Sequence, residues 1–287
     1  HKYTDGTSKT GRKYQKILKK LNLLDYEFIS KNNDDTLLEL KKNIDIKDDI
    51  YTVSNKFRKD IKDFFNKDSK NLKIVEIGSH KGYTTKYLST IFKKVYPIDL
   101  NVKHHQYSRK HNYNDNIEYI HLNLYDNSSW KVIPNDIDIV FIDANHDYEY
   151  CKMDLINSLI NFPQLKYIIF DDYGVWPGVN KVVKEFIETK HIKIEKNIGL
   201  NYKELREIPI CFDIANSKNF IINDHEGVIC KVLNIPDKII KPVINSNISN
   251  FCNYCGIHFK KNYHFENHKK KCNLDDIKKI MLELNKN

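Results

Sequence analysis

The chain has 287 residues, of which 40% are hydrophobic, and a formal net charge of +9. This length suits one α/β domain of about 200 residues with appended segments. No stretch approaches the roughly 20 apolar residues of a membrane span. We therefore expect a soluble intracellular protein in the cytoplasm, with a nuclear location as the alternative, with no signal peptide and no membrane partner. Its bias toward Lys, Asn and Ile is typical of A/T-rich genomes, such as those of protists and large DNA viruses.

The positive charge is concentrated at the two ends of the sequence. Residues 1–20 carry a net charge of +6 and residues 251–272 carry +4, which leaves −1 for the remainder. Two basic ends on a near-neutral core favour an anionic partner such as RNA or DNA. The alternative is that these lysines are solvated surface residues of a Lys-rich protein.

Strands and helices are expected to alternate through the middle of the chain. A basic, partly helical extension over 1–54 precedes the domain, and apolar residues at helical spacing predict a helix over 52–66. Strands follow at 72–77, 94–99, 117–122, 137–142 and 166–171, with helices at 83–92, 103–112, 148–162 and 178–189. Such alternation indicates an α/β, Rossmann-like, doubly wound fold with a parallel sheet.

The pattern changes after residue 190. Strand-like segments at 192–196, 208–214, 219–222 and 227–233 have no helices between them, and 224–227 has the composition of a turn. The mostly parallel sheet is therefore expected to end in a C-terminal antiparallel hairpin, which closes a domain over 55–233. Two prolines and several Asn and Ser residues then indicate a linker over 234–250.

A glycine-bearing turn joins the first predicted strand to the helix after it. Its two glycines, Gly78 and Gly82, let the backbone pass close to a ligand. Glu76 precedes the first glycine, and Asp99 ends the second strand 23 residues after Glu76. A carboxylate at that strand end can accept hydrogen bonds from both hydroxyls of a ribose. These residues indicate a nucleoside site.

The spacing of the glycines narrows the class of nucleoside. A dinucleotide site needs three close glycines to seat a pyrophosphate, and Glu76 would repel that group but suits a ligand with an ammonium group. The pattern Glu76-x-Gly78-x-x-x-Gly82 followed by Asp99 resembles the first motif of class I S-adenosylmethionine-dependent methyltransferases. The resemblance implies that Glu76, Gly78 and Gly82 form the loop at the methionine side, that Asp99 binds the ribose and that Asn123 contacts the adenine. A similar turn in another α/β protein is the alternative.

Acidic residues follow the fourth and fifth predicted strands. Asp143 ends one strand, and Asp171 and Asp172 end the next. The carboxyl ends of parallel strands share one edge, so the three carboxylates are expected near one another and near the nucleoside. Hard oxygen ligands of this number select Mg²⁺ or Mn²⁺. The alternative assigns Asp143 to the cofactor and leaves the other two acids in a solvated turn.

The sequences around these acids resemble the metal-dependent O-methyltransferases, which include the catechol, caffeoyl-coenzyme A, sugar and macrolide enzymes. By this resemblance Asp143, Asp171 and Asp172 hold Mg²⁺, Asp143 also borders the cofactor, and His146 stands where the catechol-type enzymes have a lysine base. A neutral imidazole can take a hydroxyl proton near pH 7. His146 could instead be a polar residue at the rim of the site or a neighbour of the metal ligands.

The C-terminal segment 251–287 carries a separate motif. Cys252, Cys255, His268 and Cys272 have the spacing of a zinc finger, which predicts structural Zn²⁺. Nucleic-acid binding, protein binding and bracing of a domain stay open as roles of the finger.

The leading interpretation is a methyltransferase that uses S-adenosylmethionine and Mg²⁺ on a hydroxyl of a sugar or other polyhydroxylated small molecule. An RNA methyltransferase whose basic N-terminus and zinc finger hold nucleic acid is the second interpretation. A non-catalytic zinc-finger binding module on a methyltransferase fold is the third. The substrate does not follow from the fold.

Overall fold

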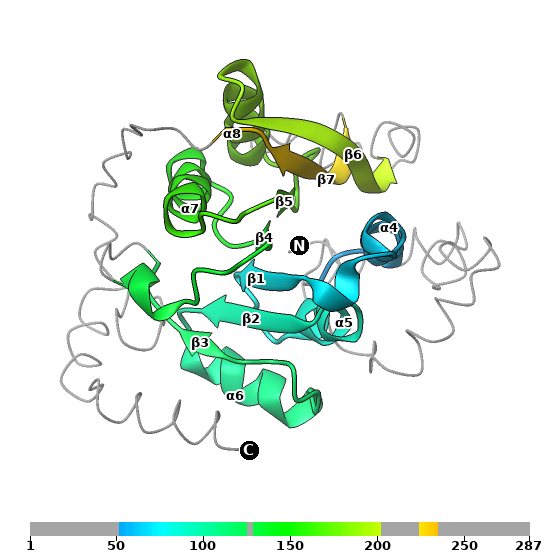
Figure 1. The fold of residues 1–287 in the computed structure, drawn as a ribbon, viewed down its shortest axis with the longest axis vertical. Helices are drawn as coiled ribbons and strands as arrows, with labels where there is room; N and C mark the ends of the chain where they lie inside the picture. Colours follow the sequence, from blue (N-terminus) through cyan, green and yellow to red (C-terminus); the bar gives the residue numbers. More distant parts are fainter. Residues whose placement is uncertain (1–51, 125–128, 202–223, 235–287) are drawn as a thin grey trace, which may run out of the picture.

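The computed structural model describes residues 52–124, 129–201 and 224–234 (Figure 1). The predicted linker, the zinc finger and the basic N-terminal extension up to residue 51 lie outside the described residues. The same holds for the strands predicted at 208–214 and 219–222. Among the described residues, no helix is long and apolar enough to cross a bilayer.

The described elements alternate as the sequence predicts. Helix α4 (Asn55–Phe65) and a short 3₁₀ turn, η2 (Ser69–Asn71), lead into the alternating part. This part contains β1 (Lys73–Ile77), α5 (Tyr83–Ile91), β2 (Lys94–Asp99), α6 (Val102–His111), β3 (Ile120–His121), η3 (Ser129–Val132), β4 (Ile139–Ile142), α7 (Tyr148–Asn161), β5 (Tyr167–Phe170) and α8 (Pro177–Glu188). The strands β6 (Ile192–Asn201) and β7 (His225–Val232) follow without a described helix between them.

The strands form one sheet of seven in the order β3-β2-β1-β4-β5-β7-β6. The first five are mutually parallel, whereas β7 pairs antiparallel with both β5 and β6. The chain starts at the centre with β1, runs outward through β2 and β3, and returns to β4 beside β1. This reversal of strand order creates a switch point between β1 and β4, the place where open α/β sheets bind ligands.

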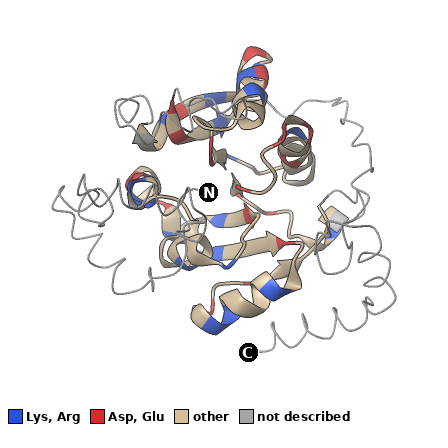
Figure 2. Ribbon diagram, turned by 180° about the vertical axis from the view of Figure 1, so that it is seen from behind, with Lys and Arg blue, Asp and Glu red and all other residues tan. Residues whose placement is uncertain are grey.

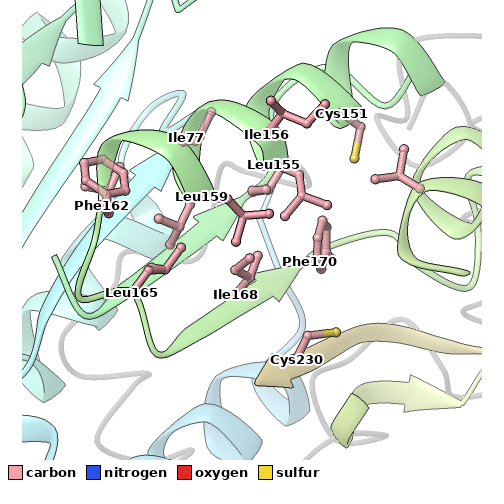
Figure 3. Packing of buried hydrophobic residues seen from close by; sticks show 14 of the residues in the cluster. Ile77, Cys151, Leu155, Ile156, Leu159, Phe162, Leu165, Ile168, Phe170 and Cys230 are labelled. Atoms are coloured by element: carbon pink, nitrogen blue, oxygen red, sulfur yellow. The ribbon is translucent and has the colours of Figure 1, made fainter. Parts of the chain in front are cut away.

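Two apolar cores cover the two faces of the sheet, which confirms the doubly wound prediction. Helices α4 and α5 pack on one face, where Phe57, Ile61 and Leu88 are fully buried. On the other face, α7 and α8 pack through residues such as Leu155 and Val182. Figure 3 shows Leu155 and Leu159 of α7 directed at Ile168 and Phe170 of β5. Burial on both faces explains the nearly continuous apolar runs of the strands.

Helix starts are encoded locally. Ser54 caps α4 by accepting the backbone N–H of Phe57 at 3.1 Å, and Asn101 caps α6 by accepting that of Lys103 at 3.0 Å. Pro177 opens α8, where its missing N–H costs no helical hydrogen bond.

Two expectations differ from the structure. The third strand was expected over 117–122 but spans only Ile120–His121, with Ile117 forming an isolated bridge to Val95. β3 lies at the edge of the sheet, so it has a neighbouring strand on one side only, and few of its residues form backbone pairs. The turn expected at 224–227 is wrong, because His225 and Gly227 lie within β7 and pair with β6. The antiparallel end of the sheet is confirmed, because β7 pairs antiparallel with β5 and with β6.

Candidate active site

The predicted site residues gather at the carboxyl edge of the parallel strands. Ile77 ends β1 and pairs with Ile98 of β2 and with Ile142 of β4. Ile142 in turn pairs with Phe170, the last residue of β5. The residues that follow these positions therefore lie side by side at this edge of the sheet. They are Gly78, Asp99, Asp143 and Asp171.

Gly78 brings the β1–α5 turn against the end of β4. Its φ is +90°, and a Cβ placed on it would lie 2.3 Å from the carbonyl oxygen of Asp143. The amides of Gly78 and Asp143 donate to Ile98 and Ile77 respectively, each at 2.9 Å. Only glycine combines this φ with such a close backbone approach. Gly78 therefore lets the ends of β1, β2 and β4 lie close together at one edge of the sheet.

Gly82 has a different structural role from Gly78. It caps α5 in the left-handed conformation with φ +78°, and its Cα faces Ser108 of α6. A Cβ there would lie 1.8 Å from the Ser108 Oγ. Gly82 thus sets the packing of α5 against α6, while its predicted contact with the cofactor stays a prediction.

Glu76 is buried inside the first strand. It is 1% exposed, and its Oε2 accepts the Thr85 hydroxyl at 2.5 Å. Burial raises the pKa of Glu76 to about 8, although the bond from Thr85 opposes this shift. A cationic ligand group would favour the ionised form, as the predicted methionine-side role requires.

Asp99 receives hydrogen bonds on both carboxylate oxygens. Oδ1 accepts the Asn101 amide at 2.7 Å, while Oδ2 accepts the His80 amide at 2.8 Å and lies 3.1 Å from His104 Nδ1. Burial alone would raise the pKa of Asp99, but these interactions outweigh it and hold the pKa below its ordinary value. Asp99 is therefore an ionised acceptor at the edge where a ribose is predicted.

Asn123 lies two residues beyond the end of β3, and His121 of β3 pairs with Asp99. It is therefore near the same edge, on the outer side of Asp99, and it is partly buried. Its predicted adenine contact is compatible with that position.

The carboxyl groups at the ends of β4 and β5 form one cluster with His146. The Nε2 atom of His146 lies 3.1 Å from Asp172 Oδ2 and 3.6 Å from Asp143 Oδ1. Burial raises the pKa of Asp143, Asp171 and Asp172, and the pKa of Asp171 rises further through the charges of the other two. Burial alone would lower the pKa of His146, but the two carboxylates outweigh it and raise that pKa.

The donor set suits a hard divalent cation, because three mutually repelling carboxyls need a positive charge. Asp171 Oδ1 is buried and has no hydrogen-bond partner in the described part of the chain. Within that same part, however, no group of three or more His, Cys, Asp or Glu side chains is arranged to hold a metal ion. The His146 ring instead lies against two of the carboxylates. Magnesium therefore stays a prediction, and the zinc ligands Cys252, Cys255, His268 and Cys272 lie outside the described residues.

Some contacts at this edge were not predicted from the sequence. The Trp176 indole stacks on His146, with ring centroids 5.2 Å apart and an interplanar angle of 11°. Thr85 reaches Glu76, and His104 reaches Asp99. Of these contact residues, only Trp176 could have been singled out from the sequence. It stands directly before the Pro-Gly pair that opens α8 and four residues after Asp172.

Residues 75–173 match the model of a family described as a methyltransferase domain. The matched segment runs from β1 to just beyond β5 and contains the glycine turn and the acids described above. Together with the order of strands in the sheet, this match makes the segment similar to a methyltransferase domain on a Rossmann-like fold.

One curated relative is the uncharacterised protein R132 of Acanthamoeba polyphaga mimivirus. It is 34% identical over 88 residues, which are 26% of this chain and 39% of that protein. The match thus spans less than half of the relative's length.

Two solved structures are also similar, a putative O-methyltransferase from Klebsiella pneumoniae and the O-methyltransferase from Bacillus cereus in complex with SAH. They are 15% and 19% identical, each with a TM-score of 0.47 and each over 72% of this chain. The matches cover 95% and 96% of those chains.

Proposed function

We propose that this protein is an S-adenosylmethionine-dependent methyltransferase that methylates a hydroxyl of a sugar or other polyhydroxylated small molecule. The observation that carries the proposal is the meeting of Gly78 with the backbone of Asp143 at the switch point of the sheet. It leaves Glu76, Asp99 and the acid cluster around one edge of a methyltransferase domain.

A chemically suitable side chain would lie near each end of the cofactor. Glu76 is buried beside the glycine turn and would take the ammonium group of the methionine end. Asp99 is an ionised acceptor at the end of β2 and would take the ribose hydroxyls. Asn123 would contact the adenine beyond it. The reactive methyl group would then lie toward Asp143 and the ends of β4 and β5.

The acceptor hydroxyl would be activated at the acid cluster. His146 would take the hydroxyl proton as the nucleophile forms, because its Nε2 lies at the edge of the sheet, 3.1 Å from Asp172 Oδ2 and 3.6 Å from Asp143 Oδ1. Asp143, Asp171 and Asp172 would hold Mg²⁺, which would lower the pKa of a bound hydroxyl. Alignment of the oxygen with the sulfonium carbon would supply much of the remaining rate enhancement.

Cofactor binding is the first test. Calorimetry with S-adenosylmethionine and S-adenosylhomocysteine should show one site per chain, and Asp99→Asn should weaken it. Absence of binding at millimolar ligand would exclude both enzymatic interpretations. It would leave the non-catalytic zinc-finger binding module as the remaining interpretation.

The metal and the acceptor need a separate test. Methyl transfer from radiolabelled S-adenosylmethionine would be measured on a panel of sugars, glycosides and catechols, with and without Mg²⁺. We expect turnover to depend on Mg²⁺ and to be lost in Asp171→Asn and Asp172→Asn. Asp115→Asn is a matched surface control, since Asp115 is exposed. Unchanged turnover in the two site variants would refute the metal role.

A specific observation also supports RNA as a second candidate acceptor. Helix α6 carries Lys103, Arg109 and Lys110 and no acidic residue, and Tyr113 just after it is 80% exposed. In Figure 2 the ribbon of this helix has the blue of Lys and Arg and none of the red of Asp and Glu. A basic surface with an exposed aromatic ring suits a single-stranded nucleic acid, which offers phosphates and unstacked bases.

The salt dependence of binding to a 20-nucleotide single-stranded RNA tests this candidate. Replacing Lys103, Arg109 and Lys110 by Ser should reduce the slope of log K against log salt by about 0.7 per lost phosphate contact. Removal of three lysines from α4, at positions 56, 59 and 62, is the control for net charge. Equal effects of the two triple variants would reject α6 as the RNA surface. Deletion of residues 1–20 and 251–287 tests whether the predicted basic ends contribute.

A further inference from the structure

The turn between β5 and α8 contacts His146 with several of its residues. It begins at Asp172, whose carboxylate lies 3.1 Å from His146 Nε2. Four residues later, the Trp176 indole lies nearly parallel to the imidazole, with an interplanar angle of 11° and ring centroids 5.2 Å apart. This is an offset stack, a preferred arrangement of two flat rings. One short turn therefore contacts both an edge and a face of the His146 ring.

The start of α8, directly after this turn, lies close to the backbone of His146. A Cβ on Gly178, in the first turn of α8, would lie 2.2 Å from the carbonyl oxygen of His146 and 2.6 Å from the Tyr148 amide. Glycine at this position thus lets the start of α8 approach the β4–α7 loop closely. Because loop and turn are in contact at the backbone, the indole is held in a defined place relative to the imidazole.

The backbone of the turn is itself strained. Asp172 has φ +58°, a left-handed conformation that is costly for a residue other than glycine. Its carbonyl accepts the amides of Val175 at 3.1 Å and Trp176 at 2.9 Å, which stabilise this conformation. Such strain persists only where the surroundings over-determine it, and it clusters at functional sites. The strained residue, Asp172, and the residue whose amide its carbonyl accepts, Trp176, both have side chains against His146.

His146 lies on a loop and not within a helix or strand, and its side chain is 23% exposed. Its Nε2 is in ion-pair range of Asp143 and Asp172 but has no aligned hydrogen bond within the described residues. The carboxylates therefore attract the ring without setting its plane. A flat surface against the ring face supplies the missing restraint.

We propose that Trp176 is the positioning residue of His146: its indole face holds the imidazole between Asp143 and Asp172, where His146 acts on the acceptor hydroxyl. The catalytic part of this inference rests on the proposed function, whereas the stacking can be tested without any substrate. Trp176 acts through His146 and takes no part in proton transfer. Misplacement of a catalytic group by about 1 Å can cost roughly 100-fold in rate, so such a restraint has a measurable value.

The chain offers a matched set of variants. Trp176→Phe keeps an aromatic face, and Trp176→Leu removes it while leaving an apolar side chain. Trp130 is the other tryptophan of the protein, is 1% exposed, and donates its indole N–H to the Leu124 carbonyl at 2.8 Å. Trp130→Phe is therefore the control for loss of a buried indole away from His146. Circular dichroism and thermal unfolding would establish that each variant is folded.

The first readout is proton–carbon NMR of the histidine rings in the full-length protein, with the His146 signals assigned by their absence in His146→Gln. The indole ring current should shift these signals upfield in the wild type. Trp176→Leu should move them downfield to the positions of unstacked histidines, while Trp176→Phe retains part of the shift. Trp130→Phe should leave them in place. His146 signals that do not move in Trp176→Leu would overturn the proposal.

The second readout is methyl transfer to an acceptor found in the panel above. Trp176→Leu should lower kcat about 10- to 100-fold with little change in the KM for S-adenosylmethionine, and Trp176→Phe should recover most of the loss. Moved NMR signals with unchanged kcat would reject the positioning role. Failure of the proposed function has a different signature, which is absence of cofactor binding in the wild type.

Discussion

The hydroxyl of Thr85 donates to Oε2 of Glu76 at 2.5 Å, inside the interior between β1 and the first turn of α5. This bond stabilises the ionised form of Glu76, yet burial outweighs it and raises the pKa to about 8. The carboxyl is therefore mostly protonated at pH 7. A ligand with an ammonium group near Glu76 would favour the ionised form and expel the proton.

Proton release on cofactor binding follows from this arrangement. At pH 7, S-adenosylhomocysteine should release up to one proton as it binds, and the release should vanish above about pH 9, where Glu76 is already ionised. Calorimetry in phosphate and in Tris measures it, because the two buffers have different ionisation enthalpies. Glu76→Gln should abolish the release and weaken binding at least 10-fold. Equal binding enthalpies in both buffers would contradict the methionine-side role.

The same pKa predicts how stability depends on pH. Because the pKa in the folded state lies above the ordinary value of 4.5, the folded protein retains a proton that the unfolded chain loses. The stabilisation is complete below pH 4.5 and is lost as the pH rises toward about 8. Urea unfolding at pH 5 and pH 8 should show a smaller loss of stability in Glu76→Gln than in the wild type. Glu118→Gln, at a residue whose side chain is 47% exposed, should behave like the wild type.

Replacing Asp99 tests the ribose site. Asp99→Asn keeps the shape of the side chain but removes its charge and one acceptor. A hydrogen bond to a charged group contributes about 1.5–3 kcal/mol, so the Kd for S-adenosylhomocysteine should rise roughly 10- to 100-fold. Calorimetry measures the change, and Asp115→Asn on the surface serves as the control. An unchanged Kd would place the ribose elsewhere.

The two glycines of the turn should respond differently to substitution. Gly78→Ala places a Cβ against the backbone of Asp143 and requires a left-handed alanine, which together cost more than about 1–3 kcal/mol of stability. Gly82→Ala meets the Ser108 side chain instead. Ser108→Ala should therefore recover part of the loss caused by Gly82→Ala and none of that caused by Gly78→Ala. Thermal unfolding of the single and double variants measures this, and equal recovery in both cases would contradict it.

The fold was largely predictable because its signals are local. The apolar strands, the Ser54 and Asn101 caps and the strict alternation of elements produce the observed order of strands and helices. The errors lie where local composition was ambiguous. The Asp-His-Glu-Gly segment reads as a turn, yet pairing with β6 makes it the start of β7, because sheet partners distant in sequence override local preference.

The candidate site was predictable only in part. Acids at strand ends can be read from the sequence, because parallel strands deliver their carboxyl ends to one edge. The residues that form hydrogen bonds or ion pairs with those acids cannot be read from the sequence. His104 lies five residues after Asp99 on a helix, and nothing in the spacing says that its ring turns back to the carboxylate. The same limit applies to the predicted magnesium site. Whether the side chains converge on a common point depends on tertiary packing, which the sequence pattern does not give.

The amino-acid sequence alone determined the class of fold, the glycine turn and the kind of charge at each strand end, because these follow from residue type and short-range spacing. Only the tertiary structure decided that Thr85 reaches Glu76, that Gly78 abuts Asp143 and that Trp176 lies against His146. Such contacts join segments that the chain separates by loops, helices and strands. Their geometry depends on how the layers pack on the sheet, and no local pattern encodes it.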